Sequence, residues 1–256
     1  MLNTTDPQSG FILIDKPARI TSHDVVDVLR RLTGIKKIGH AGTLDPFATG
    51  LLIIAIGRET TREISKFVGM DKTYEAQIVL GATTASLDTE TEVIFNRVGA
   101  YGHTPLRRDE IENAMKKLTG EIDQIPPMHS AIKVGGKRLY KSARKGEEVR
   151  VEPRKIRVKE FTMIEPKIPQ VSGRPVEQKT QIISAHIKCS SGTYVRALAR
   201  DLAAELGTVG YLRNLKRTSI GKFELQNAIK LKDLTANNWQ ILVKSLKEMA
   251  IDEKAI

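Results

Sequence analysis

Strand-forming and helix-forming segments are mixed along this chain without a regular strand–helix rhythm. Apolar patterns predict strands over residues 11–14, 51–56, 74–80, 156–164 and 181–189. Apolar residues at helical spacing predict helices over residues 22–33, 59–68, 108–118 and 194–206. A regular alternation would indicate a doubly wound sheet, so this order predicts an α+β protein instead.

Capping and turn-forming residues indicate where several of these segments begin or end. Ser22 has the side chain of a helix N-cap, and Gly34 is placed to end that helix. The glycine pair 135–136 predicts a tight turn. Residues 39–50 and 166–178 are rich in glycine, proline and small polar residues, and we expect both to be loops.

Charge and cysteine content narrow the class of protein. The 256 residues carry 41 Lys and Arg against 30 Asp and Glu, a formal net charge of +11. This excess favours a polyanionic partner such as a nucleic acid, although a basic soluble enzyme of another kind has the same charge. The single cysteine, Cys189, excludes an intramolecular disulfide and a cysteine-based zinc site, and it fits a reducing compartment.

The sequence contains neither an evident membrane segment nor a nucleotide-binding motif. Residues 1–10 are polar and lack an apolar signal core, and the longest apolar run, residues 51–56, is too short to span a bilayer. No GxGxxG segment follows a strand and there is no Walker loop, so nucleotide cofactors are not indicated. We therefore expect a cytoplasmic protein with no membrane contact.

The most informative segment is the glycine-punctuated stretch around Asp45. Its glycines allow the backbone to approach a ligand closely, and Pro46 restricts the backbone directly after the carboxylate. Loops held by a rigid scaffold often carry catalytic residues. An Asp before a Pro is also an ordinary turn signal, so these residues alone leave both a turn and a catalytic carboxylate open.

Residues 39–52, GHAGTLDPFATGLL, resemble the motif GHxGxLDPxATGLL of the TruB family of tRNA pseudouridine synthases. Five further blocks resemble that family in the same order: residues 13–17 with Ser22; 72–74 with 80–81; 125–131 with 137–140 and 143–144; 189–196; and 211–215. The resemblance implies the pseudouridine synthase fold, a mixed and mainly antiparallel central sheet flanked by helices, with a catalytic cleft across the sheet.

The resemblance also implies a division of the chain. Residues 10–223 correspond to the catalytic domain, and residues 224–256 form a short C-terminal extension with one or two helices over 231–251. Many family members carry an RNA-binding module of the PUA type in this region. The extension is shorter than a domain of ordinary size, so we expect that module to be truncated or absent.

By resemblance, the chain converts uridine 55 in the T loop of tRNA to pseudouridine without a metal or organic cofactor. Asp45 matches the catalytic carboxylate, and attack on the sugar, attack on the base and elimination to a glycal all remain open for it. Arg196 matches the arginine that pairs with this aspartate and keeps it ionised. Tyr74 matches the tyrosine that stacks on the target base and is a candidate for C5 deprotonation, although a core aromatic is the alternative.

Further residues match positions that bind RNA. His40 matches a residue that fills the space left when the target uridine flips out. Tyr194 and Leu212 resemble walls of the base pocket, and Asp88 matches an acidic position near the active site, although Ala85 departs from the pattern there. A basic cluster is expected to contact phosphates, or else to be a solvated face: Lys133, Lys137, Arg138, Lys141, Arg144 and Lys145 around Tyr140.

Two other functions remain open at this point. The protein could act as an RNA-folding helper without catalysis, but Asp45, Tyr74 and Arg196 are all present, which favours the enzyme. A glycosidase would need a second carboxylate facing the first, and no second acid stands out in the Asp45 loop. We expect a monomer with no obligate protein partner, which binds the T-arm of tRNA.

Overall fold

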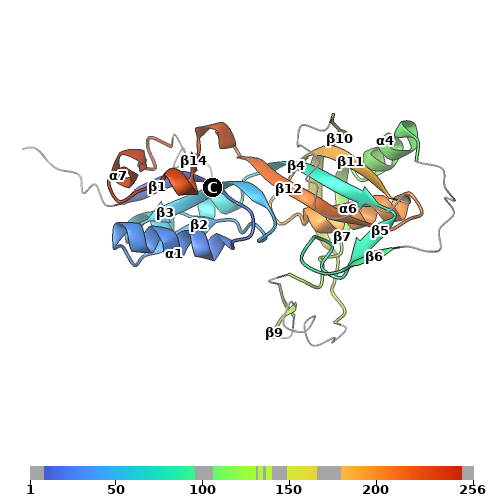
Figure 1. Cartoon of the computed structure of the whole chain (residues 1–256), viewed down its shortest axis with the longest axis horizontal. Coiled ribbons are helices and arrows are strands. Elements are labelled where there is room, and N and C mark those ends of the chain that lie inside the picture. The colour runs from blue at the N-terminus through green and yellow to red at the C-terminus, as the bar shows by residue number, and fades with distance from the viewer. Residues whose placement is uncertain are drawn as a thin grey trace, which may run out of the picture. The chain divides into compact units, whose positions relative to one another are not determined.

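The computed structural model describes residues 9–95, 106–130, 132–134, 137–139, 149–165 and 180–249 (Figure 1). The chain divides into two compact units. The first unit contains Met1–Thr73 and Lys216–Ile256, and the second contains Tyr74–Leu215. Two strands, β4 (Lys72–Leu80) and β12 (Gly210–Ile220), have residues in both units.

A mixed sheet forms the centre of the first unit, in the order β14-β1-β3-β12. Its strands are β1 (Gly10–Lys16), β3 (Thr49–Ile56), the end of β12 and β14 (Ile229–Lys230). The β1–β3 pair is antiparallel from Gly10↔Ile56 to Lys16↔Gly50, whereas β1–β14 and β3–β12 are parallel. The short strands β2 (Ile38–Ala41) and β13 (Phe223–Glu224) add antiparallel pairs to β3 and β12.

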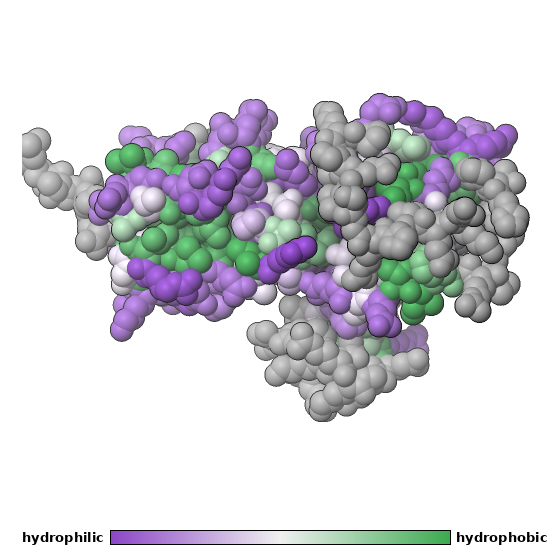
Figure 2. Space-filling view, in the orientation of Figure 1, coloured by the Kyte–Doolittle hydropathy of each residue, from purple (hydrophilic) through white to green (hydrophobic). Residues whose placement is uncertain are grey.

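Alternation along β1 and β3 gives this sheet two buried faces. Ile12 and Ile14 pack in a cluster with Val25, Val26 and Leu29 of α1 (Ser22–Thr33), and Leu234 and Trp239 join this cluster. Phe11 and Leu13 point to the other face, where they pack with Phe67 and Phe223. A sheet buried on both faces explains why residues 51–56 form a continuous apolar run. In Figure 2, hydrophobic residues of this unit lie between α1 and the C-terminal segment, with hydrophilic residues on either side.

The helix predicted from residue 22 forms, but its N-cap prediction is wrong. Thr21 is the N-cap: its hydroxyl accepts a hydrogen bond from the amide of Asp24, and the Asp24 carboxylate accepts one from the amide of Thr21. This capping box leaves the hydroxyl of Ser22 available for another contact. Gly34 ends the helix as predicted, with a φ of 73°.

Two other local predictions also differ from the structure. The expected loop over 39–50 begins as strand β2, because residues 38–41 pair with residues 53–56. The single helix expected over 59–68 is two short helices, α2 (Arg58–Arg62) and α3 (Ser65–Val68). Thr60 and Thr61 donate their hydroxyls to preceding carbonyls, a local contact that competes with helix continuation.

The second unit is built on a sheet in the order β12-β4-β11-β10-β7. Strands β7 (Gly120–Gln124), β10 (Arg154–Met163) and β11 (Gln181–Cys189) are antiparallel to their neighbours in the β7–β10 and β10–β11 pairs. Helix α4 (Arg108–Lys117) packs against β10 and against α6 (Val195–Glu205), which is buried along most of its length. Two small hairpin-like pairs complete the unit, β5–β6 (Ala82–Thr84 and Val93–Phe95) and β8–β9 (Lys133–Val134 and Lys137–Arg138).

The predicted α+β class and mixed, mainly antiparallel sheet flanked by helices are confirmed. The strands predicted over 11–14, 51–56, 74–80, 156–164 and 181–189 all form. Strands β7 and β12 were not predicted, because charged residues interrupt their apolar pattern and one of them, Arg217, is buried in β12. The glycine turn 135–136 and the loop 166–178 lie outside the described residues.

Candidate active site

The carboxylate of Asp45 lies on the connection between β2 and β3 in the first unit, and its neighbours on both sides are fixed. The hydroxyl of Ser22 accepts a hydrogen bond from the amide of Leu44 at 2.9 Å and donates one to the carbonyl of Leu44 at 3.1 Å. Directly after Asp45, the amide of Ala48 donates to the Asp45 carbonyl at 3.1 Å and closes a turn. The backbone on the N-terminal side of Asp45 is therefore held by a side chain 22 residues away from Leu44.

Pro46 is held by the segment that follows β1. The amide of Arg19 donates to the Pro46 carbonyl at 2.8 Å, and Nζ of Lys16 lies 3.4 Å from the same oxygen. Lys16 is fully buried and also donates to the carbonyls of Pro17 and Ile20. Arg19 has a φ of 71°, a left-handed conformation that is rare for a residue other than glycine and that clusters at functional sites.

His40 lies on β2, opposite Ile54 of β3, and belongs to the same motif as Asp45. Burial lowers the pKa of His40 below its usual 6.5, and the positive charges of Arg217 and His23 lower it further. The imidazole is therefore neutral near pH 7. Within the described chain, Nδ1 of His40 has no hydrogen-bond partner. A neutral planar ring in this position suits stacking against a base.

Asp88 and Arg196 form a buried ion pair in the second unit. Nη1 of Arg196 lies 3.2 Å from Oδ2 of Asp88, and the side chains are 6% and 1% exposed. The guanidinium also donates to the carbonyls of Ser86 and His129, each at 2.9 Å. The other carboxylate oxygen of Asp88 accepts from the Ser86 hydroxyl at 2.6 Å and from the amide of Glu90 at 2.9 Å. A charged pair this deeply buried needs such additional hydrogen bonds.

The two predicted wall residues are fixed through their backbones. Gln124, which is buried, accepts from the Tyr194 amide at 2.8 Å and donates to its carbonyl at 3.2 Å. The amide of Leu212 donates at 3.0 Å to the carbonyl of Leu87, the residue before Asp88. Leu87, like Arg19, has a positive φ, 61°. Asp88, Arg196 and Leu212 are thus brought together within the second unit.

Tyr74 begins the second unit near the start of β4, and its side chain is buried, with 8% exposed. Lys133, Lys137 and Arg138 lie on the β8–β9 pair, where Lys133 is opposite Arg138. Arg144, like Lys141 and Lys145, lies outside the described residues. The pairing of Asp45 with Arg196 and Tyr74 joins residues of different units, so it stays a prediction, as does the cleft across the sheet.

Sequence reasoning missed three buried polar residues that fix this site. These residues are Lys16, Gln124 and Arg217, and no local sequence pattern indicates that any of them is buried. Lysine and arginine are almost never buried without a partner, so their burial is informative, but it is visible only in the structure. In the part of the chain that the structure describes, no three His, Cys, Asp or Glu side chains come together as a metal site.

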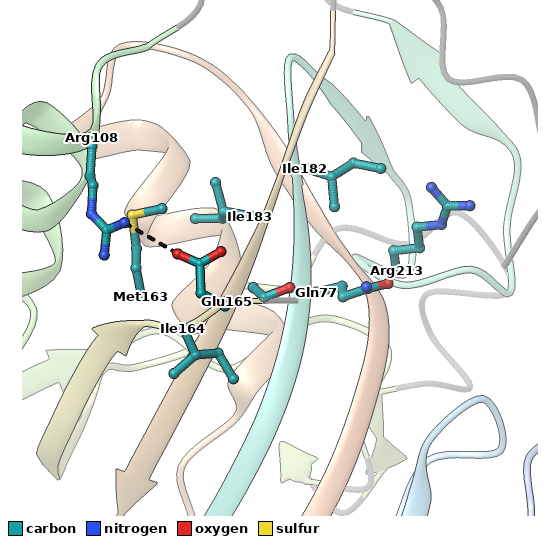
Figure 3. Close-up of a pocket in the computed structure, with 9 residues that line it drawn as sticks. Gln77, Arg108, Met163, Ile164, Glu165, Ile182, Ile183 and Arg213 are labelled. Atoms are coloured by element: carbon teal, nitrogen blue, oxygen red, sulfur yellow. Dashed lines mark ion pairs between the residues drawn. The ribbon is translucent and has the colours of Figure 1, made fainter. Parts of the chain in front are cut away.

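A pocket of about 190 Å³ lies elsewhere in the second unit (Figure 3). Its lining includes Gln77 of β4, Arg213 of β12 and Ile182 of β11. Arg108 and Glu165 form an ion pair of 3.6 Å there, and both are exposed to solvent. None of the predicted site residues lines this pocket. The Arg108–Glu165 pair is a solvent-exposed ion pair, which contributes little energy, so we do not take the pocket as the candidate active site.

Among the helices described, none is long and apolar enough to pass through a membrane.

Comparison with known proteins identifies the family. Residues 30–195 match the model of the TruB family pseudouridylate synthase N-terminal domain. A tRNA pseudouridine synthase B from Mycobacterium sp. (strain KMS) is 45% identical over 222 residues, which cover 87% of this chain and 70% of the relative. The same enzyme from Mycobacterium tuberculosis (strain ATCC 25618 / H37Rv) is 44% identical over 233 residues, 91% of this chain and 73% of the relative.

Solved structures agree with this result. A chain of a Cbf5–Nop10–Gar1 complex matches 96% of this chain with a TM-score of 0.65 and 27% identity. A chain of an H/ACA RNP bound to a substrate RNA containing 2′-deoxyuridine matches 96% with a TM-score of 0.62 and 25% identity. This chain spans only 58% and 57% of those two chains. With its fold, its Asp45 loop and these relatives, the chain belongs to the TruB family of pseudouridylate synthases.

Proposed function

We propose that this protein converts uridine 55 in the T loop of tRNA to pseudouridine, as an isomerase that needs no metal or organic cofactor. The observation that carries the proposal is the fixed position of Asp45, whose neighbours Leu44 and Pro46 are held by Ser22, Arg19 and Lys16. The two curated relatives, both named tRNA pseudouridine synthase B, support tRNA as the substrate.

The reaction breaks the bond between N1 and C1′, turns the base and joins C5 to C1′. The product gains a hydrogen on N1 and loses the hydrogen on C5, so a base is needed and no oxidant or reductant. Asp45 is the carboxylate that acts on the nucleotide, and it suits attack on the sugar, attack on the base and elimination alike. Arg196 pairs with it and keeps it ionised, because a guanidinium stabilises a carboxylate in a pocket.

Access to the target requires that the uridine leaves the stacked T loop. His40 suits the vacated position because its ring is planar and its lowered pKa keeps it uncharged near pH 7. Tyr74 stacks on the extruded base, with Tyr194 and Leu212 beside it and Asp88 holding Arg196. The basic residues Lys133, Lys137, Arg138 and Arg144, within a net charge of +11, contact phosphates of the T-arm without reading sequence. We propose a monomer that works in the cytoplasm.

The test is release of tritium from unmodified tRNA transcripts labelled at C5 of uridine, followed by mapping of the modified position. The wild-type chain is expected to release tritium from uridine 55 alone. Asp45→Asn is expected to release none and to bind the transcript as wild type does. Asp27→Asn removes a partly exposed carboxylate of α1 that pairs with Arg30 and His23, and it serves as the control with full activity. Product at another position, or near wild-type release by Asp45→Asn, would refute the proposal.

A further inference from the structure

Arg217 is a buried arginine of β12 whose guanidinium reaches both ends of the Asp45 loop. Its Nε donates to the carbonyl of Leu51 at 2.8 Å, and its Nη2 donates to the carbonyl of Gly42 at 3.0 Å. Only 1% of the residue is exposed. Gly42 precedes Asp45 by three residues and Leu51 follows it by six, so one side chain joins the two strands of the loop at its base.

The backbone around Arg217 fixes where this side chain begins. Strands β12 and β3 are parallel there, with Arg217 opposite Gly50 and Lys216 opposite Thr49. Gly50 has a φ of 104°, and a Cβ on it would lie 2.3 Å from the carbonyl oxygen of Arg217. This close contact between the two backbones fixes the register of β3 and β12. The Cα of Arg217, and with it the start of the side chain, is therefore fixed relative to the Asp45 loop.

The nature of the side chain also indicates its role. A buried cation is unfavourable unless its donors are satisfied, and a hydrophobic residue would fill the same space at lower cost if packing were the only requirement. The planar fork of arginine presents several donors in fixed directions, whereas the ammonium of lysine is a single point charge. In Arg217 two nitrogens of this rigid fork, Nε and Nη2, bind the carbonyls of Leu51 and Gly42, which are nine residues apart in the sequence.

We propose that Arg217 is a positioning residue for the isomerisation, which holds the Asp45 loop in its reactive geometry without contacting the RNA. The proposal rests on the proposed function, because it takes Asp45 as the catalytic group. A displacement of about 1 Å at a reacting group can lower a rate by about 100-fold. Loss of Arg217 therefore lowers the rate of the chemical step and leaves tRNA affinity in place.

Two variants separate positioning from simple stabilisation of the fold. Arg217→Lys keeps the charge but replaces the fork, and Arg217→Met keeps the length without any donor. We expect single-turnover rates about 10-fold lower for Arg217→Lys and about 100-fold lower for Arg217→Met, with the Kd for unmodified tRNA within about 2-fold of wild type. The matched control is Leu29→Ala, a cavity in α1 of the same unit that lowers the unfolding temperature while leaving the rate unchanged.

The outcomes separate the two proposals. The positioning role would be overturned if the rates of the Arg217 variants fell no more than the rate of Leu29→Ala. It would also be overturned if their rates fell in parallel with tRNA affinity. Failure of both variants to fold would assign Arg217 to the fold alone and would overturn it as well. A wild-type chain that makes no pseudouridine, or an active Asp45→Asn, would instead refute the proposed function, and the wild-type assay is read first.

Discussion

The hydroxyl of Ser22 makes both backbone hydrogen bonds of Leu44, one to its amide at 2.9 Å and one to its carbonyl at 3.1 Å. Ser22 is buried at the start of α1, while Thr21 caps that helix in its place. The residue before the proposed catalytic carboxylate is thus tied to a helix N-terminus. The first residue of α1 thereby holds the backbone next to Asp45 through two hydrogen bonds.

Ser22→Ala is expected to lower both stability and rate. It leaves the amide and the carbonyl of Leu44 buried without their partner, which costs about 1–3 kcal/mol of unfolding free energy. The loop is also released, so the single-turnover rate on tRNA falls by about 10-fold or more. Urea unfolding and a single-turnover assay on the same preparations measure the two effects.

Thr21→Ala is the matched control for that variant. It removes the neighbouring hydroxyl, which caps α1 at the exposed side, and it costs about 1 kcal/mol of stability without touching Leu44. Its rate is expected to equal that of wild type. Equal rates in the two variants would show that the Ser22 hydrogen bonds do not position Asp45.

Gly50→Ala is expected to prevent folding or to lower the unfolding free energy by about 3 kcal/mol or more. The added Cβ would need both a left-handed backbone and space that the carbonyl of Arg217 occupies. Gly34→Ala is the control, since Gly34 also has a positive φ, 73°, but no atom lies within 4 Å of its added Cβ. That variant is expected to lose only about 1 kcal/mol. Similar unfolding midpoints for the two variants would contradict the close approach of β3 and β12.

The sequence predicted the family and the α+β class of the chain, but not the hydrogen bonds that hold the Asp45 loop. The Asp45 loop was recognised as a motif, and the α+β class followed from the mixed order of strand and helix patterns. The hydrogen bonds of Arg217 reach across 166 and 175 residues, and no local pattern reports such a contact. The local sequence predicts Ser22 as a helix N-cap, because a serine before a helix often has that role. Its actual partner, Leu44, is 22 residues away in the sequence and is not visible in a local pattern.

The buried pair of Asp88 and Arg196 is expected to behave as one unit. Asp88→Asn removes the carboxylate that pairs with the buried guanidinium in the second unit and should cost about 3–5 kcal/mol of unfolding free energy. The double variant Asp88→Asn with Arg196→Met should lose less than the sum of the single losses, because it removes both charges. Lys117→Met breaks an exposed ion pair with Glu205 and should cost less than about 1 kcal/mol. Additive losses measured by urea unfolding would show that the two residues are not coupled.

Because the pKa of His40 is lowered in the folded protein, the free energy of unfolding is expected to fall as the pH decreases. Burial, with the charges of Arg217 and His23, disfavours the protonated ring in the folded protein, while the unfolded chain binds a proton with the ordinary pKa of 6.5. The stabilisation by the neutral ring is fully present above pH 6.5 and is lost as pH falls through the lowered folded pKa. His40→Gln removes this titration, so its unfolding temperature should fall less than that of wild type between pH 7.5 and pH 5. His186→Gln, beside Glu160 in the second unit, is the control that should follow wild type, because His186 is not among the charges that lower the pKa of His40. Parallel losses in wild type and His40→Gln would contradict a buried neutral imidazole.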